Sequence, residues 1–262
     1  MKLGWMAPLN PPLPAWSGRR VWIVGASSGI GSAAAALLHS RGAQVFASAR
    51  NEAALNEFAA RHAGARALAL DAANEDEVRR TAAILLQDGP LDLVLYCAGR
   101  YQAQRATAFD LREMKQHQQV NFLGALHVIA AVLPSMLEHG RGHLSLVSSV
   151  AGYLGLPNSL AYGPTKAALI NLAQTLYFDL RPRGLAVSLV NPGFVQTPLT
   201  QHNEFRMPGL ISPERAALYM TQGWARGQFE IHFPRRFTLV MKLLALLPFR
   251  WAQAILRKGT GL

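Results

Sequence analysis

The chain of 262 residues has a single cysteine, Cys97, and few charged residues. One cysteine excludes an internal disulfide framework and fits a reducing compartment, so we expect a cytoplasmic protein. The sequence lacks both Cys-x-x-Cys and His-Glu-x-x-His, and we expect no metal site. Only 16% of the residues are charged although the net charge is +11, which excludes a highly charged, tail-like protein. We expect no nucleic-acid partner.

The N-terminus lacks a long hydrophobic run. Residues 1–18 contain four prolines, which leave no apolar core of about 7–15 residues such as a secretory signal needs. We interpret this stretch as a proline-rich arm that lies extended on the surface, tethered by Trp5 and Trp16. No repeat of about 20–50 residues is visible. Half of the chain is hydrophobic, so it can bury a sizeable core.

From Arg19 onward, short apolar strands alternate with helical stretches. Strands are predicted over 20–24, 44–48, 65–70, 91–96, 143–147 and 185–190, and helices over 32–40, 52–62, 75–87, 111–133, 159–180 and 213–226. This alternation predicts an α/β fold with a doubly wound, Rossmann-type parallel sheet in one domain, residues 19–228. Ligands of such sheets bind at the carboxyl ends of the strands. Five candidate residues each follow directly on a predicted strand: Gly25, Asp71, Gly99, Ser149 and Pro192.

A glycine-rich turn separates the first predicted strand from its helix. It reads Gly25-Ala26-Ser27-Ser28-Gly29-Ile30-Gly31. Backbone N–H groups and the helix dipole at such a turn both favour a phosphate. The spacing G-x-x-x-G-x-G differs from the usual G-x-G-x-x-G fingerprint. A plain turn is the alternative, but the position between strand and helix favours a nucleotide.

The second predicted strand ends without an acidic residue, in Ala49-Arg50. In dinucleotide-binding folds an acid at this place binds the adenosine ribose, whereas an arginine accommodates a 2′-phosphate. Arg50 therefore favours NADP(H) over NAD. The alternative is a solvated loop arginine.

Tyr162 and Lys166 stand four residues apart at the start of a predicted helix, which places them on one face. A tyrosine has an ordinary pKa of about 10, and a nearby cation lowers that pKa by stabilising the phenolate. The spacing alone is common and also fits a surface pair. The convergence of strand ends with Ser149 nearby favours a catalytic pair instead.

Together these motifs resemble the short-chain dehydrogenase/reductase family, in its compact single-domain branch. The matching residues are Gly25-x3-Gly29-x-Gly31, Asp71, Ala98-Gly99, Asn121, Ser149, Tyr162-x3-Lys166 and Pro192-Gly193 with Thr197. They span residues 20 to about 198 in the family's order and spacing. The resemblance implies a sheet of about seven parallel strands and NAD(P)-dependent hydride transfer to or from a carbonyl or alcohol. We also expect a homo-oligomer.

The resemblance also implies roles for these residues. Tyr162 would be the general acid/base, and Lys166 would lower its pKa and hold the nicotinamide ribose. Ser149 would hydrogen-bond the substrate oxygen, and Asn121 would hold a water of the proton relay. Cofactor contacts would come from Gly25, Ser27, Ser28, Gly29, Ile30, Gly31, Arg50, Asp71, Ala98, Gly99, Pro192, Gly193 and Thr197, with Asp71 at the adenine and Thr197 at the nicotinamide amide.

Three positions bear on this match. Val24 stands where the family often has threonine, and Cys97 where it often has asparagine. Both family side chains mainly brace the backbone, so these departures concern packing and not catalysis. Pro164 removes one backbone donor from the turn between Tyr162 and Lys166. It is tolerable if the helix begins only shortly before Tyr162.

Residues 198–212 should cover the pocket, with Phe205, Met207, Leu210 and Ile211 as apolar candidates. An apolar lid favours a sterol- or lipid-like carbonyl substrate over a sugar. Two other functions stay open. Epimerase or dehydratase chemistry is disfavoured by the lack of a larger C-terminal substrate domain. A non-enzymatic scaffold or sensor would normally have lost part of the Asn-Ser-Tyr-Lys tetrad, and all four residues are present.

The C-terminal residues 229–262 read as a basic, amphipathic tail beyond the last predicted strand. The segment contains six basic residues and a single acidic residue, Glu230. The apolar run 237–247 contains Lys242 and is far shorter than the roughly 20 residues that span a bilayer, and Pro248 separates it from a second segment with Trp251 and Ile255. This composition fits a peripheral element at the inner membrane surface. It fits equally a tail that folds back over the pocket or enters a dimer interface.

Overall fold

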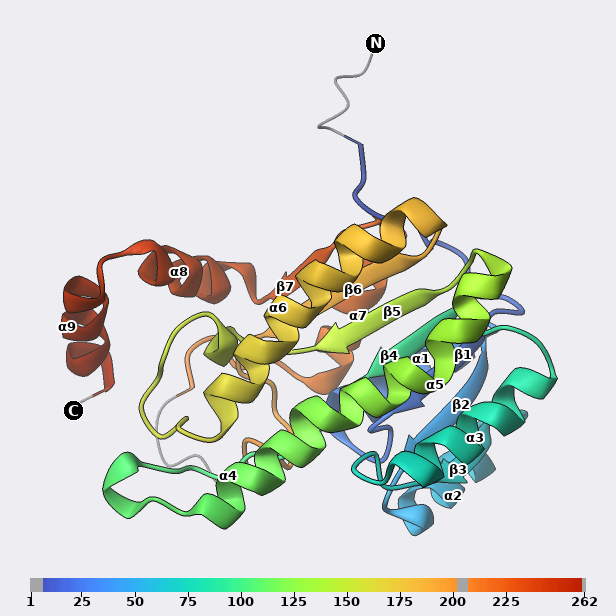
Figure 1. The fold of residues 1–262 in the computed structure, drawn as a ribbon, viewed down its shortest axis with the longest axis horizontal. Coiled ribbons are helices and arrows are strands. Elements are labelled where there is room, and N and C mark those ends of the chain that lie inside the picture. The colour runs from blue at the N-terminus through green and yellow to red at the C-terminus, as the bar shows by residue number, and fades with distance from the viewer. Residues whose placement is uncertain (1–6, 202–206, 261–262) are drawn as a thin grey trace.

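A computed structural model describes residues 7–201 and 207–260 and shows one parallel sheet of seven strands (Figure 1). The strand order is β3-β2-β1-β4-β5-β6-β7, so the chain winds outward in both directions from β1 and β4. The strands are β1 (Arg20–Val24), β2 (Gln44–Ala49), β3 (Arg66–Ala69), β4 (Leu93–Tyr96), β5 (His143–Val147), β6 (Ala186–Pro192) and β7 (Glu230–Phe233). The predicted doubly wound sheet is confirmed.

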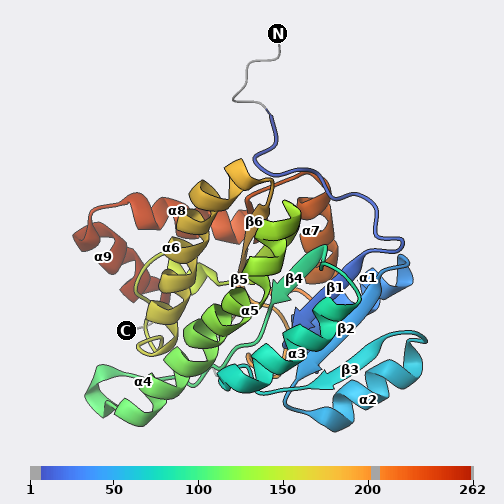
Figure 2. The same ribbon diagram turned by 45° about the vertical axis from the view of Figure 1, so that its right-hand side comes forward.

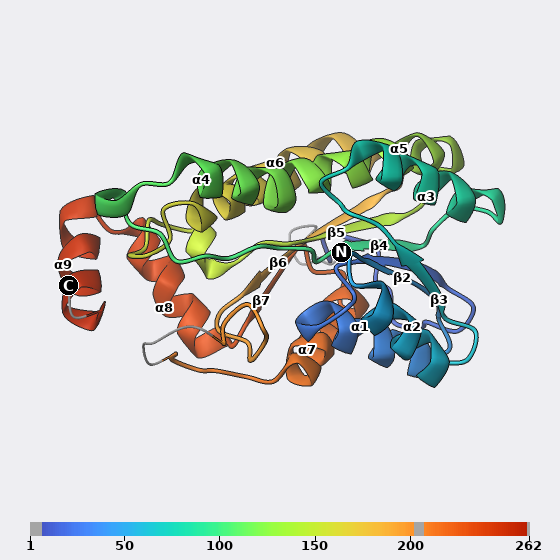
Figure 3. The same ribbon diagram turned by 90° about the horizontal axis from the view of Figure 1, so that it is seen from below.

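Helices cover both faces of the sheet (Figure 3). One face carries α1 (Gly29–Ser40), α2 (Glu52–Arg61) and α7 (Pro213–Ala225); the other carries α3 (Glu75–Gln87), α4 (Leu111–Gln118), α5 (Gly124–His139) and α6 (Tyr162–Leu180). Short turns of helix are η2 (Ala106–Ala108), η3 (Gln119–Leu123), η4 (Val150–Gly152) and η5 (Arg181–Arg183). The chain ends in α8 (Arg235–Leu246) and α9 (Phe249–Thr260).

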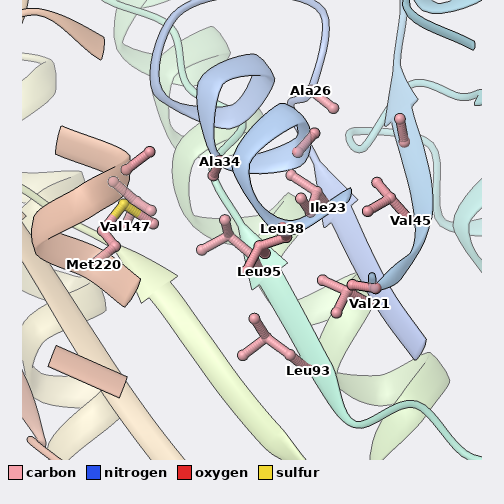
Figure 4. Packing of buried hydrophobic residues seen from close by; sticks show 14 of the residues in the cluster. Val21, Ile23, Ala26, Ala34, Leu38, Val45, Leu93, Leu95, Val147 and Met220 are labelled. Atoms are coloured by element: carbon pink, nitrogen blue, oxygen red, sulfur yellow. The ribbon is translucent and has the colours of Figure 1, made fainter. Parts of the chain in front are cut away.

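Alternating side chains of the central strands fill two apolar layers. Val21 and Ile23 point to the layer beneath α1 and α7, where Leu38 lies close to them and Met220 lies beside Val147 (Figure 4). The side chains between them, Trp22 among them, enter the layer beneath α3, α5 and α6. Strands that are covered on both faces consist of nearly continuous apolar residues. This is why the run RVWIV predicts a buried strand.

The helix predicted over 111–133 differs in the structure. It divides into α4, a π-helical turn (η3) and α5, and Pro134 lies inside α5 rather than at its end. The helix continues to His139 because the residues around the proline pack on the sheet, with Val132 and Met136 buried. Gly140 then ends it at φ 60°. Within the described residues, Leu111–His139 is long and apolar enough to cross a bilayer by length and composition, but its apolar face belongs to the core.

The N-terminal arm binds the sheet more closely than a surface strap would. The Asn10 side chain donates to Val187 O (2.7 Å) and accepts from Val187 N (3.1 Å) at the start of β6. Trp16 is buried edge-on against Trp224 of α7, with 5.7 Å between ring centroids. The arm therefore runs along the amino edge of the sheet, away from the predicted site (Figure 2). The other predicted tether, Trp5, lies outside the described residues.

The prediction that residues 229–262 lie beyond the last strand is wrong, because this segment opens with β7. The strand has four residues, pairs with β6 alone and buries only every second side chain. Such a short edge strand carries a weak sequence signal. The break at Pro248 is confirmed: α8 ends at Leu246 and α9 begins at Phe249. Pro192 also differs, since it is the last residue of β6 and does not follow it.

Candidate active site

Backbone packing explains the glycines of the turn after β1. Gly25 has φ +97°, and a Cβ there would lie 2.4 Å from Ala98 N. At Gly31 a Cβ would meet Gly25 O at 2.1 Å. The turn is thus pressed against the end of β4, and only glycine fits at these two positions.

The start of α1 is open to an anion. Among the described residues, no side-chain hydrogen bond caps this helix at Ser28, and its first turn has no acid. The first N–H groups of a helix need partners, and phosphate oxygens supply them. Gly29 has φ +56° and would meet the Thr197 side chain if it carried a Cβ. The residues present therefore fit the diphosphate of a dinucleotide.

A cavity of about 310 Å³ runs along the carboxyl ends of the strands from this turn to Tyr162. It is lined by most of the residues that the sequence pointed to: Gly25, Ser27, Ser28, Gly29, Ile30, Arg50, Asp71, Ala98, Gly99, Ser149, Tyr162, Lys166, Pro192, Gly193 and Thr197. Gly31 and Asn121 are the exceptions. Gly31 packs behind the turn, and Asn121 is fully buried behind Gly99.

The β2 end of the cavity carries one exposed cation. Arg50 directly follows β2, and the next residue, Asn51, uses its side chain to cap α2 at Ala54 N (3.1 Å). Asp71 accepts from Ala73 N at 3.0 Å and thereby fixes the loop after β3. Cys97, where the family often has asparagine, is held through its backbone, because its N–H donates to Val24 O at 2.8 Å.

The other end of the cavity brings Ser149, Tyr162 and Lys166 together. Helix α6 begins at Tyr162, so Pro164 falls in its first turn, where a missing N–H costs little. Lys166 is buried, donates from Nζ to Val147 O (2.9 Å) and lies 5.4 Å from the centroid of the Tyr162 ring. Ser148 Oγ donates to Lys166 O (2.7 Å), which fastens α6 to the end of β5.

Burial decides the protonation of this pair. Desolvation raises the pKa of Tyr162 above its ordinary value, and a hydrogen bond with Ser149 only partly opposes the rise. Burial also lowers the pKa of Lys166 to about 8. Desolvation therefore sets the direction of the Tyr162 pKa shift in this structure, and the lowering of that pKa by Lys166 stays a prediction. The ammonium group donates to a backbone carbonyl rather than to the phenol, and desolvation is the larger effect.

Asn121 occupies the π-helical turn and is fixed by three hydrogen bonds. Its Oδ1 accepts from Arg100 N (2.7 Å), and its Nδ2 donates to Arg100 O and to Thr165 Oγ1, both at 3.0 Å. Both amide hydrogens are thus in use. A relay water at Asn121, as the resemblance implies, would have to contact a remaining oxygen lone pair or the backbone.

A second cavity of about 120 Å³ adjoins the first at Tyr162. Its wall comes from the segment after Ser149, including Val150 and Leu156, and from Phe194 and Leu199. Tyr101 closes it edge-on against Tyr162, with 5.2 Å between ring centroids. The smaller cavity therefore extends from Tyr162 and is mostly apolar.

The expected apolar lid residues that the structure describes do not form this wall. Ile211 pairs with Val195 and packs against the core, and neither Met207 nor Leu210 lines either cavity. Phe205 lies outside the described residues.

Sequence reasoning missed Tyr101, Thr165 and the apolar residues of the second cavity. Thr165 stands between Tyr162 and Lys166 and could have been noticed there. Tyr101 follows a strand-end glycine, Gly99, by two residues, which is a weak signal. Nothing in the sequence indicates that Val150 and Leu156 reach the pocket.

Comparison with known proteins shows to which family the chain belongs. The model of a family described as short chain dehydrogenase matches residues 19–206. The chain belongs to the short-chain dehydrogenase family. An uncharacterized oxidoreductase of Myxococcus xanthus is 35% identical over 235 residues, which cover 88% of this chain and 93% of that protein. As a member of the family, the chain is an NAD(P)-dependent oxidoreductase.

Two solved short-chain dehydrogenases share the fold. One from Burkholderia cenocepacia J2315, in complex with NADP, has a TM-score of 0.81 at 23% identity and covers 92% of this chain and 98% of its own. One from Burkholderia phymatum, in complex with NAD, has a TM-score of 0.80 at 25% identity, with coverage of 88% and 94%. The seven-stranded sheet is thus that of short-chain dehydrogenases.

Proposed function

We propose that this short-chain dehydrogenase uses NADP(H) to interconvert a carbonyl group and a secondary alcohol on an apolar substrate. One observation carries the proposal: the two cavities meet at Ser149 and Tyr162, which line both. The first cavity contains the phosphate-binding turn, and the second has an apolar wall. A hydroxyl pair at their junction lies where the cofactor and the substrate would meet.

When bound, NADPH would supply the hydride for the carbonyl carbon, and the carbonyl oxygen would then gain negative charge. The hydroxyls of Ser149 and Tyr162 are placed to donate hydrogen bonds to that oxygen. One such preorganised donor contributes about 2.7–4 kcal/mol in a well-studied case. Tyr162 then delivers its proton to the oxygen. Its raised pKa keeps it protonated at neutral pH, which suits an acid in the reductive direction.

Lys166 and Asn121 support this step without contacting the substrate oxygen: Lys166 would bind the cofactor, and Asn121 positions a loop. An ammonium group can donate three hydrogen bonds, and Lys166 Nζ donates one of them to Val147 O. That Lys166 also lines the larger cavity supports a role for the remaining donors in binding ribose hydroxyls. Asn121 fixes the loop after β4 through both backbone groups of Arg100.

The preference for NADP(H) depends on Arg50. The two structural neighbours contain NADP in one case and NAD in the other, so similarity alone favours neither cofactor. Arg50 is exposed at the end of β2, lines the cavity, and has no acid beside it in the sequence. A charge-assisted hydrogen bond contributes about 1.5–3 kcal/mol, which supports a preference of roughly tenfold or more.

The substrate class depends on the second cavity. The wall next to the hydroxyls of Ser149 and Tyr162 consists largely of apolar side chains, those of Val150, Leu156, Pro157, Phe194 and Leu199. The apolar substituent of a bulky ketone would pack against this wall, whereas the hydroxyls of a sugar would lose their hydrogen bonds to water there.

Turnover with a substrate panel tests the proposal. Loss of the NADPH absorbance band is followed with apolar ketones and with sugars of similar size, and the reverse reaction is followed with NADP⁺ and secondary alcohols. We expect reduction of the apolar ketones. Tight NADPH binding without turnover of any carbonyl or alcohol would instead favour a non-enzymatic scaffold or sensor. Light scattering on the same protein tests the expected homo-oligomer.

A further inference from the structure

Helices α8 and α9 present an apolar surface to solvent. Seven of the seventeen large hydrophobic side chains that are exposed in the described part of the chain lie here: Leu239, Val240, Leu243, Leu246, Phe249, Trp251 and Ile255. Leu246 and Phe249 are each 82% exposed. Together with the exposed cations Arg235, Arg236, Arg250 and Lys258, these residues form what we call the α8–α9 face.

The opposite side of α8 is already packed. Met241 and Leu244 are buried against Val150, in the segment that lines the substrate cavity. Lys242 donates to Glu230 Oε2 of β7 at 2.5 Å, and Glu230 also accepts from Tyr153. The helix cannot turn its outer residues inward without breaking these contacts. The exposure of the α8–α9 face is therefore a fixed feature of the fold.

The charge of this face indicates its partner. Residues 234–262 contain no acidic side chain. In a two-fold contact between copies, the same patch meets itself, so the arginines of one copy would face those of the other without a carboxylate from this segment. An anionic bilayer offers both complements at once, negative headgroups for the cations and an acyl boundary for the apolar side chains.

The dimensions favour a helix pair that lies on the bilayer rather than across it. Each helix has 12 residues, or about 18 Å of length, against a hydrocarbon core of about 30 Å. Figures 1 and 3 show both helices at one end of the molecule, outside the sheet and beside the segment that follows β5. That end also contains the substrate cavity.

We propose that the α8–α9 face binds the surface of anionic membranes, with Leu243, Leu246, Phe249 and Trp251 inserted at the boundary between headgroups and acyl chains. This interaction is independent of the proposed redox reaction.

Sedimentation of the full-length protein with vesicles tests the proposal. Vesicles of phosphatidylcholine alone are compared with vesicles that also contain phosphatidylglycerol, at low and moderate salt. We expect binding to the anionic vesicles that weakens as salt rises. The triple variant Leu243→Ser/Leu246→Ser/Phe249→Ser should lose at least tenfold in partitioning. The matched control Leu9→Ser/Ile84→Ser/Leu218→Ser, at exposed positions elsewhere, should partition like the wild type.

A charge pair supplies a second test that does not alter the apolar surface. Each cation near an anionic bilayer is worth about fivefold in binding, so Arg236→Gln/Arg250→Gln should weaken partitioning by about 25-fold. The control Arg80→Gln/Arg183→Gln has the same net charge and changes exposed arginines on other surfaces. It should weaken binding only slightly. Thermal melting shows that each variant is folded.

The proposal is wrong if the wild type stays in the supernatant with anionic vesicles at low salt, or if each control loses as much binding as its matched variant. It is also wrong if light scattering shows that the triple variant dissociates a dimer while vesicle binding is unchanged, since the face would then be a subunit contact. Because vesicle binding is measured without substrate, a failure of NADPH turnover counts against the redox proposal alone.

Discussion

The Thr165 hydroxyl connects Asn121 to Tyr162. It accepts from Asn121 Nδ2 at 3.0 Å and donates to the Tyr162 backbone carbonyl at 2.7 Å. The π-helical turn before α5 is thereby linked to the first turn of α6. Since Asn121 also holds Arg100, a single buried hydroxyl helps to fix the loop after β4 against the proposed acid/base.

Thr165→Val should reduce kcat by about tenfold and destabilise the protein by about 1–3 kcal/mol, because it leaves a buried amide hydrogen without a partner. Turnover, NADPH affinity and urea unfolding measure the two effects. Thr175→Val, in the exposed part of the same helix, is the control and should change neither. Normal kcat in a folded Thr165→Val would show that this link does not position Tyr162.

Tyr162→Phe should lower kcat by roughly 10²–10⁴-fold, because it removes the proposed proton donor. NADPH affinity, measured by fluorescence titration, should stay near the wild-type value. Tyr177→Phe serves as control, since it removes a hydroxyl that donates to Leu9 O in the N-terminal arm. Retention of a tenth of wild-type kcat by Tyr162→Phe would contradict the acid/base assignment.

Arg50→Ala should cost at least tenfold in kcat/KM for NADPH and little for NADH, because only NADPH carries the 2′-phosphate. Arg41→Ala removes an exposed arginine at the far end of α1 and should leave both values unchanged. Equal efficiency of the wild type with both cofactors would contradict the predicted preference.

His143 should make the protein sensitive to acid. It is buried in β5, and Ser188 donates its one hydroxyl proton to Gln228 O. In the 2.7 Å contact between His143 Nε2 and Ser188 Oγ, the imidazole is then the donor. Burial lowers the pKa of His143 to about 3.

The unfolded chain binds a proton at this histidine below pH about 6.5, whereas the folded protein does not until pH about 3. Stability from this group is therefore complete above pH about 6.5 and is lost as the pH falls toward 3. At pH 4.5 the loss should be about 2–3 kcal/mol relative to pH 7. Urea unfolding at the two pH values measures it. His143→Gln should flatten this dependence, whereas His139→Gln, at an exposed position, should not.

The sequence by itself determined the parallel sheet and the glycine-rich turn after its first strand. Continuous apolar runs such as RVWIV require burial on both faces, and a run of closely spaced glycines between a strand and a helix is a pattern of adjacent residues. Tyr162 and Lys166 were also legible, because four-residue spacing on a helix is a local property. Each of these features follows from residues that are close together in the sequence, so it can be predicted without knowing which distant segments pack against them.

Only the tertiary structure decided the rest. The pKa of Tyr162 rises because distant segments remove water from it, and spacing in one helix cannot show that. The four residues of β7 become a strand because β6 offers an open edge to pair with. The apolar wall of the second cavity comes from residues near 150 and 194, which meet only when β5 and β6 lie side by side. The tail's apolar composition likewise did not reveal which side of α8 packs inward, because that depends on the pairing of Lys242 with Glu230 in β7.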